Sequence, residues 1–326
     1  MKEFTIGKND AGQRLDRWLG KTLPLLPAPL AQKYIRLKRV KVNGKGSQRD
    51  YRLAQGDLLQ LYINDEFFDK PREDNAFLSV FKPVLDIVYE DANLIICNKR
   101  PGLLCHPDAG EYVNTLITHI QAYLYQKKEW DPRGESSFTP ALCHRIDRNT
   151  GGLVIAAKTA EALRIMNQKI KDREIEKYYL CVVSGVLSPK AGLLEDYLWK
   201  DEAKKQVFLR DRPVPGGKTA QTEYRTLAVQ GGLSLVECHL LTGRTHQIRA
   251  QMAHAGHPLL GDGKYGDGQL NRRYGRTHQA LWAYRLAFAF TSDAGALEYL
   301  NGKSWAVDRV DFVEEYFPME KSRIFC

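Results

Sequence analysis

The apolar residues of this chain fall in short runs, and this limits the folds that it can adopt. Runs such as Leu153–Ala157 and Tyr178–Val183 contain five and six residues, the length of a buried β-strand. None approaches the roughly 20 residues that a membrane-spanning helix needs. The chain has 326 residues, which is longer than a single hydrophobic core usually supports. We therefore expect one large domain and one small domain.

Strand and helix patterns are mixed along the larger part of the chain. Helical spacing of apolar residues predicts a helix over Asn114–Tyr125 and another after Thr159, whose side chain can cap it. Strands are predicted in succession as well as between helices, at Ile87–Tyr89, Leu94–Cys97, Leu153–Ala157, Tyr178–Val183 and Gly232–Leu241. This order predicts an α+β fold with a mixed, mainly antiparallel central sheet flanked by helices. Neither GxGxxG nor GxxxxGKS/T occurs, so the sequence predicts no nucleotide cofactor.

The composition is typical of a packed protein, since 43% of the residues are hydrophobic and 27% are charged. The first residues, Met1–Thr5, lack the apolar segment of a signal peptide. The six cysteines, at positions 97, 105, 143, 181, 238 and 326, form no CxxC pair and mostly lie in apolar runs. We interpret them as buried thiols in a reducing compartment, which predicts a cytoplasmic protein without a cysteine-based zinc site.

Positive charge is concentrated near the N-terminus. Residues 1–70 contain 14 Lys and Arg against eight Asp and Glu, which supplies +6 of the formal net charge of +9. Between Lys33 and Arg52 there are eight basic residues and one acidic residue, Asp50. A phosphate backbone is the natural partner of such a segment. On charge alone, a solvated basic face is an equally good interpretation.

The N-terminal segment follows the order helix, helix, hairpin. A second helix is predicted to begin near Pro29, and Asn43-Gly44 is a strong hairpin signal before a strand over Asp57–Ile63. The strings RLDRWL from Arg14, RVKVNG from Arg39 and LAQGD from Leu53 resemble the S-four-like (alpha-L) RNA-binding domain. This resemblance implies two helices packed on a small sheet. It also implies that RNA contacts the basic helix and turn, which carry Lys33, Arg36, Lys38, Arg39 and Lys41.

The segment of residues 64–82 is charged, contains Pro71 and has no periodic pattern, which is typical of a linker. We therefore predict an S-four-like RNA-binding domain over residues 1–65, a linker over residues 66–82 and a larger domain over residues 83–326.

The densest polar cluster is the string CHRIDRNTGGL that begins at Cys143. It places Asp147 between Arg145 and Arg148, whose charges favour the ionised carboxylate that a nucleophile or base requires. The glycine pair that follows would let the backbone approach a ligand closely. Taken alone, these residues favour a simpler interpretation, a turn before a strand with Asp147 as its cap.

A second cluster is the string LTGRTHQIR that begins at Leu241. Arg244 and Arg249 lie five residues apart and could clamp phosphate groups or pair with a carboxylate. The histidines at positions 246, 254 and 257 could suggest zinc, but no carboxylate or cysteine completes a known ligand spacing. We interpret these histidines as structural and predict no metal.

Taken together and in this order, the motifs resemble those of the RluA-type pseudouridine synthases. They are HRID with the following Thr-x-Gly-Leu, the string KYYLC from Lys177, and TGRTHQIR from Thr242. The segment IICNKRPG from Ile95 also resembles the first motif of that family. The resemblance covers about residues 84–290 and implies that residues 83–326 are a pseudouridine synthase catalytic domain with a central cleft.

The resemblance assigns a role to each matching residue. Asp147 corresponds to the catalytic aspartate, the proposed nucleophile. Tyr179 corresponds to the tyrosine that packs against the target base and can transfer a proton. Arg244 corresponds to the arginine that pairs with the aspartate, and Arg145 to the arginine that holds the place of the flipped nucleotide in the RNA helix.

Two positions depart from the family pattern. Ile146 replaces a leucine of nearly the same size. Gly151 replaces a serine, and the loss of its hydroxyl is expected to weaken the order of the loop more than the chemistry.

The reaction implied is the isomerisation of specific uridines in structured RNA, with large-subunit ribosomal RNA as the expected substrate. The uracil is detached from the ribose, turned and reattached through its carbon 5. Because a stacked uracil hides these atoms, the nucleotide must be flipped out of the helix. No redox change occurs, so we expect neither cofactor nor metal. The expected partner is RNA, without a membrane, and the expected state is a monomer.

Other interpretations stay open. A non-catalytic RNA-binding or ribosome-assembly protein would not need Asp147, Tyr179 and Arg244 together. A hydrolase would need a nucleophile and base signature such as GxSxG, which the chain lacks. A synthase acting on tRNA would carry the same motifs. The sequence also does not distinguish attack of Asp147 on the sugar, attack on the uracil ring, or removal of a sugar proton.

Overall fold

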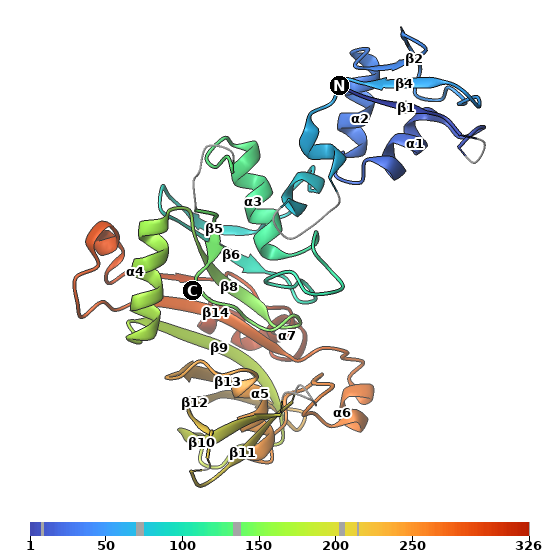
Figure 1. The fold of residues 1–326 in the computed structure, drawn as a ribbon. Helices are drawn as coiled ribbons and strands as arrows, with labels where there is room; N and C mark the ends of the chain where they lie inside the picture. The colour runs from blue at the N-terminus through green and yellow to red at the C-terminus, as the bar shows by residue number, and fades with distance from the viewer. Residues whose placement is uncertain (8–9, 70–74, 133–137, 202–205, 214, 326) are drawn as a thin grey trace. The chain divides into compact units, whose positions relative to one another are not determined.

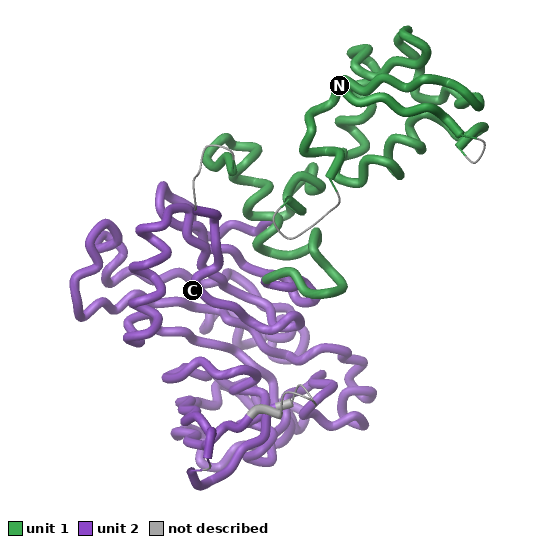
Figure 2. The backbone as a smooth tube through the Cα atoms, in the orientation of Figure 1, with its two compact units in different colours: residues 1–84, 106–136 green, residues 85–105, 137–326 purple. Residues whose placement is uncertain are grey.

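A computed structural model describes residues 1–7, 10–69, 75–132, 138–201, 206–213 and 215–325. The chain divides into two compact units, residues 1–84 with 106–136 and residues 85–105 with 137–326 (Figure 2). No helix in these described ranges is long and apolar enough to cross a membrane. The predicted domain boundaries at residues 65 and 83 stay a prediction.

The first unit contains a four-stranded antiparallel sheet in the order β1-β4-β2-β3 (Figure 1). Its elements are β1 (Lys2–Thr5), α1 (Leu15–Thr22), α2 (Ala28–Arg36), β2 (Val40–Val42), β3 (Lys45–Gly46) and β4 (Leu58–Leu61). Asn43 and Gly44 have φ angles of 50° and 77°, which the tight turn between β2 and β3 requires. The predicted order of two helices and a hairpin is therefore confirmed, whereas β1 was not predicted.

The apolar faces of α1 and α2 and the strands of this sheet form one hydrophobic core. Leu15, Trp18 and Leu19 of α1 are buried together with Tyr34 and Ile35 of α2. The same unit contains the short turns η1 (Asp65–Phe68) and η2 (Ala76–Ser79) and the helix α3 (Leu116–Gln126). These turns occupy parts of the predicted linker, whose residues 70–74 lie outside the described residues.

The second unit is built on an 11-stranded sheet. Its main path runs β11-β10-β12-β13-β9-β14-β8-β6-β5, with β15 paired to β14 and β7 paired to β8. Strands β8 and β14 run parallel, and the other pairs of named strands are antiparallel. This arrangement confirms the predicted α+β class with a mixed, mainly antiparallel sheet.

The strands of this sheet are β5 (Ile87–Glu90), β6 (Leu94–Lys99), β7 (Ala141–Leu142), β8 (Gly151–Ala157), β9 (Ile175–Ser184), β10 (Ala191–Asp201), β11 (Gln206–Arg210), β12 (Lys218–Gln230), β13 (Leu233–Leu240), β14 (Leu281–Phe288) and β15 (Ser304–Ala306). The helices are α4 (Ala160–Lys171), α5 (Gln247–His254), α6 (Gly268–Arg273), α7 (Asp311–Tyr316) and α8 (Lys321–Ile324), with the short turns η3 (Gly295–Leu300) and η4 (Pro318–Glu320).

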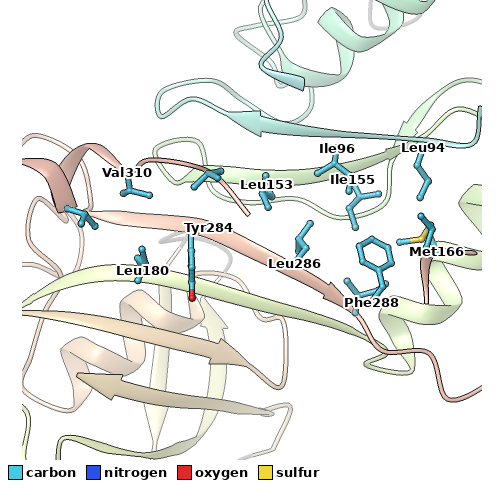
Figure 3. Packing of buried hydrophobic residues seen from close by; sticks show 14 of the residues in the cluster. Leu94, Ile96, Leu153, Ile155, Met166, Leu180, Tyr284, Leu286, Phe288 and Val310 are labelled. Carbon is cyan, nitrogen blue, oxygen red and sulfur yellow. The ribbon is translucent and has the colours of Figure 1, made fainter. Parts of the chain in front are cut away.

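Every residue of β8 is buried, because this strand lies in the interior of the sheet. Leu153 and Ile155 contribute to a core that also contains Met166 of α4 and Leu286 and Phe288 of β14 (Figure 3). The Thr159 hydroxyl accepts a hydrogen bond of 3.1 Å from the backbone N–H of Ala162, which confirms the predicted cap of α4. This packing holds the start of β8, which begins four residues after Asp147.

Candidate active site

Asp147 lies in a turn immediately before β8. The backbone N–H of Thr150 donates to the Asp147 carbonyl at 3.1 Å, so the backbone of Asp147 closes the turn. Its carboxylate is directed elsewhere, since Oδ2 accepts a hydrogen bond of 2.8 Å from Nη1 of Arg249. The interpretation of the Asp147 side chain as the cap of this turn is therefore wrong.

Arg249 is the residue that fixes this carboxylate. It belongs to α5, is buried, and forms a two-point ion pair with the fully buried Asp262, with Nε–Oδ2 and Nη2–Oδ1 distances of 2.7 and 2.9 Å. Burial alone would raise the pKa of Asp262, but the hydrogen bonds and charge of Arg249, with the backbone N–H groups of Lys264 and Tyr265, lower it. Burial lowers the pKa of Arg249, but the hydrogen bonds and charges of Asp262 and Asp147 raise it by more. Arg249 is thus a permanently charged anchor between Asp262 and Asp147.

The predicted pair between Arg244 and Asp147 is not formed. Nε of Arg244 donates to the Thr219 carbonyl at 3.1 Å, and its backbone N–H donates to Oε1 of Gln247 at 2.9 Å. Arg244 precedes α5, whereas Arg249 lies within that helix and reaches the buried Asp262. The partner of Asp147 is therefore Arg249, and the assignment of this pairing to Arg244 is wrong.

The two carboxylate oxygens of Asp147 have different surroundings. Nη1 of Arg249 lies 2.8 Å from Oδ2, and Nε2 of His246 lies 3.9 Å from the same oxygen. Among the residues that the structure describes, Oδ1 makes no hydrogen bond or ion pair. The Asp147 side chain is 27% exposed, so a ligand can reach it. One oxygen is held by the protein and the other is available for chemistry.

Tyr179 lies on β9, the strand that pairs with both β13 and β14. Burial, with smaller contributions from the charges of Asp147 and Cys105, raises the pKa of its hydroxyl well above the usual value of 10. The charge of Asp147 therefore acts on the Tyr179 hydroxyl, which stays neutral at physiological pH.

Lys99 is a buried residue that contacts the turn carrying Asp147. It belongs to the motif that begins at Ile95, but the sequence suggested no role for it. Nζ of Lys99 donates to the carbonyls of Arg100, Leu103 and Arg148 at 3.1, 2.9 and 2.9 Å. Burial lowers the pKa of Lys99 to about 8. By binding carbonyls on both segments, Lys99 ties the loop after β6 to the turn that carries Asp147.

The position of Gly151 is explained by the neighbouring strand. Gly151 pairs with Trp282 of β14, and a Cβ built on Gly151 would lie 2.5 Å from the indole ring. The indole Nε1–H also donates to Oδ1 of Asn98 at 3.1 Å, which fixes the ring. Here the tryptophan occupies the space of the serine side chain, so the glycine marks a change in packing.

We expect Gly151→Ser to destabilise the protein by about 1–3 kcal/mol, because overpacking a filled site forces its neighbours to shift. Thermal unfolding measures this effect. Adding Trp282→Leu to Gly151→Ser should recover part of the lost stability, whereas Gly20→Ser, where no atom lies within 4 Å of the added Cβ, serves as a control. Equal melting temperatures for wild type and Gly151→Ser would contradict this account.

The predicted RNA-binding residues are accessible. Lys33, Arg36, Lys38 and Arg39 are exposed on α2 and the turn after it, and Lys41 of β2 is partly exposed. The Arg39 guanidinium lies 5.5 Å from the centre of the Tyr34 ring, and Nζ of Lys41 lies 5.1 Å from that of Tyr62. In the second unit, Arg145 is exposed beside Asp147.

Within the described residues, potential metal ligands of Asp196, Asp211 and His254 lie within 4.8 Å of one another. These groups already serve as hydrogen-bond partners, since Nε2 of His254 lies 2.7 Å from Asp211 and Gln251 donates to Asp196 at 2.7 Å. The group includes His254 but neither His246 nor His257.

Comparisons with known proteins agree with this geometry. The family model of RNA pseudouridylate synthase matches residues 93–254, a range that contains Asp147, Tyr179 and Arg249. An uncharacterized RNA pseudouridine synthase of Mycoplasma genitalium is 33% identical over 293 residues, which covers 88% of each chain. Ribosomal large subunit pseudouridine synthase D of Neisseria meningitidis serogroup A is 33% identical and covers 87% of this chain and 74% of its own.

Two further proteins are similar. Ribosomal large subunit pseudouridine synthase C of Vibrio vulnificus is 31% identical over 80% of this chain and 79% of its own. Among solved structures, human RNA pseudouridylate synthase domain containing 4 has a TM-score of 0.54 and 22% identity, and covers 73% of this chain and 92% of that chain. At this identity the structural similarity supports the fold alone.

Proposed function

Because this chain belongs to the RNA pseudouridylate synthase family, we propose that it isomerises specific uridines of large-subunit ribosomal RNA to pseudouridine. The observation that carries this proposal is the partly exposed Asp147 carboxylate, which a buried arginine holds through Oδ2 and whose Oδ1 has no partner among the described residues. The ribosomal substrate is supported by the names of the relatives from Neisseria and Vibrio. We also propose that the protein acts in the cytoplasm, where it would meet ribosomal RNA. We propose that it is a monomer, because one chain supplies all the proposed catalytic groups.

In the proposed reaction, the bond between ribose C1′ and uracil N1 breaks and a bond between C1′ and C5 forms. C5 then loses its proton and N1 gains one, so the atoms balance without a co-reactant. Asp147 is proposed to act as the nucleophile through Oδ1, and Arg249 holds the carboxylate in its orientation through Oδ2. An ionised Asp147 is equally required if the carboxylate attacks the ring or removes a sugar proton.

Three other residues have proposed roles at the flipped nucleotide. Tyr179 is proposed to pack against the uracil through its ring; burial raises the pKa of its hydroxyl, which stays protonated and is a weak acid at neutral pH. Arg145, which is exposed, occupies the gap that the flipped nucleotide leaves in the RNA helix. Arg244 is proposed to contact the RNA backbone, since Arg249 already pairs with Asp147.

The direct test is to incubate the protein with transcripts of large-subunit ribosomal RNA and of tRNA and to map pseudouridine by mass spectrometry. Pseudouridine at defined positions of the ribosomal transcript is the expected result. Modification of tRNA alone would favour the tRNA-acting alternative. Binding without modification of either RNA would favour a non-catalytic RNA-binding protein. RNA from cells that lack the protein identifies the natural position.

We also propose that residues 1–65 are an S-four-like domain that increases affinity for RNA. Combined charge reversal at Arg36, Arg39 and Lys41 should weaken binding and reduce the slope of log affinity against log salt. The expected reduction is about 0.7–0.9 for each phosphate that the variant no longer neutralises. Turnover at saturating RNA should survive, because these residues do not contact the target base.

A matched control reverses Arg164, Lys171 and Lys190, exposed residues of the second unit, and so makes the same change in net charge. Filter binding at several salt concentrations compares the two variants. If both lower the affinity equally, the effect is due to net charge and the N-terminal segment has no specific role.

A further inference from the structure

His246 lies between Asp147 and Tyr265. Its Nε2 lies 3.9 Å from Oδ2 of Asp147, and its Nδ1 lies 3.0 Å from the hydroxyl of Tyr265. The backbone of His246 is left-handed, with φ of 54°, directly before α5. Histidine is among the residues that adopt this conformation more often than most, so the backbone here tolerates it. The placement of both ring nitrogens, and not the backbone, points to a use for the ring.

The position of the imidazole proton follows from the Tyr265 hydroxyl. The backbone N–H of Val207 donates to the hydroxyl oxygen of Tyr265 at 3.1 Å. The remaining hydroxyl proton can then be donated to Nδ1 of His246, which satisfies both groups. A neutral imidazole that accepts at Nδ1 carries its proton on Nε2, the nitrogen that faces Asp147.

Charges around His246 favour this neutral form. Burial lowers the pKa of the imidazole, and the positive charges of Arg249 and Lys264 act in the same direction. The carboxylates of Asp147 and Asp262 oppose them, but the net direction is downward from 6.5. At neutral pH the ring therefore has one N–H to donate.

We propose that His246 is a positioning residue that donates Nε2–H to Oδ2 of Asp147 when RNA binds. The present distance of 3.9 Å is longer than a hydrogen bond, and such contacts often tighten only in the substrate complex. With Arg249 and His246 both on Oδ2, the carboxylate cannot rotate, and Oδ1 stays directed at the nucleotide. This inference rests on the proposed function, because it concerns how the same carboxylate is aimed.

Two substitutions separate the two ends of the ring. His246→Gln places an amide N–H where Nε2 was, so it keeps the contact with Asp147. His246→Asn places its amide near the position of Nδ1, so it keeps the contact with Tyr265 but does not reach Asp147. We expect kcat to fall by less than about tenfold for glutamine and by about 100-fold for asparagine, with little change in KM for RNA.

Backbone strain alone predicts the opposite order. Asparagine adopts the left-handed conformation more readily than glutamine, so His246→Asn should then be the more stable and the more active variant. Thermal unfolding of both variants shows whether each is folded. An asparagine variant as active as the glutamine variant, or more active, would overturn the positioning role.

A spectroscopic measurement tests the same arrangement without RNA. In protein labelled with ¹⁵N-histidine, the ring nitrogen shifts of His246 should report a neutral imidazole protonated at Nε2 at pH 7. Tyr265→Phe removes the hydroxyl donor and should change that tautomer balance, whereas His246→Gln assigns the signal by removing it. A proton on Nδ1 in the wild-type protein would overturn the inference.

The two levels of the hypothesis fail in different ways. If the wild-type protein makes no pseudouridine in any tested RNA, the proposed function fails while the tautomer result still stands. If the wild type is active and the glutamine and asparagine variants lose equal activity, only the role of His246 fails.

Discussion

Asp147→Ala should abolish pseudouridine formation while RNA binding and the melting temperature stay near those of the wild type. Activity is lost because no other described group can replace the carboxylate oxygen that Arg249 orients. Stability is retained because Asp147 is partly exposed and Arg249 keeps its two-point pair with Asp262 after Asp147 is removed. Single-turnover assays on one defined RNA measure the loss.

Asp147→Asn is the matched variant, since it preserves size and can still accept a hydrogen bond from Arg249 but has no negative charge. It should be as inactive as the alanine variant. Measurable turnover by Asp147→Ala on the correct RNA, at any pH, would remove this residue from the mechanism.

Arg249→Met should lose both activity and stability. The substitution leaves the fully buried Asp262 without its cation, and removing one partner of a buried pair typically costs about 3–5 kcal/mol. It also removes the group that orients the Asp147 carboxylate, so turnover should fall further than the loss of folded protein explains. Chemical denaturation and single-turnover rates corrected for the folded fraction measure the two effects.

The pH dependence of stability has a defined sign. In the wild type the pKa of Asp262 lies below its usual 3.8, so the pair contributes fully above that value and is lost as the pH falls through the lowered pKa. In Arg249→Met, the orphaned and buried Asp262 should instead have a raised pKa. The stability difference between the two proteins should therefore be largest at neutral pH and shrink on acidification.

The double variant Arg249→Met with Asp262→Asn separates the two roles of this arginine. Asparagine carries no charge and can still accept hydrogen bonds from the backbone N–H groups that Asp262 binds. The double variant should recover much of the stability and remain inactive. If it recovered activity as well, the contact of Arg249 with Asp147 would have no catalytic role.

Local patterns predicted much of the fold. The hairpin turn at Asn43-Gly44, the cap at Thr159 and the buried strand Leu153–Ala157 depend on neighbouring residues, and each was confirmed. Strands β10, β11, β12 and β14 were not predicted. Strand β14 pairs with β8 and β9, which are distant in sequence, and a local pattern does not contain such a register. Strands β10, β11 and β12 pair with strands that neighbour them along the chain, and the apolar pattern alone did not reveal them.

The candidate site, like the fold, was predicted only in part. Motif order indicated Asp147 and Tyr179 as site residues, and their catalytic roles stay a prediction. The partner of Asp147 was predicted wrongly, because the choice between Arg244 and Arg249 depends on Asp262, whose burial is a tertiary property. The loss of serine at Gly151 likewise became understandable only with Trp282 beside it.

The position of β14 determines when the site can exist during synthesis of the chain. In the sheet, β14 lies between β8 and β9, although it is made more than 90 residues after either strand ends. Asp147 precedes β8, whereas Tyr179 lies on β9 and Arg249 follows it. A nascent chain that ends before residue 281 therefore has both halves of the site but lacks the strand that holds them in register. The site can therefore be held in register only after residues 281–288 have been synthesised and have joined the sheet.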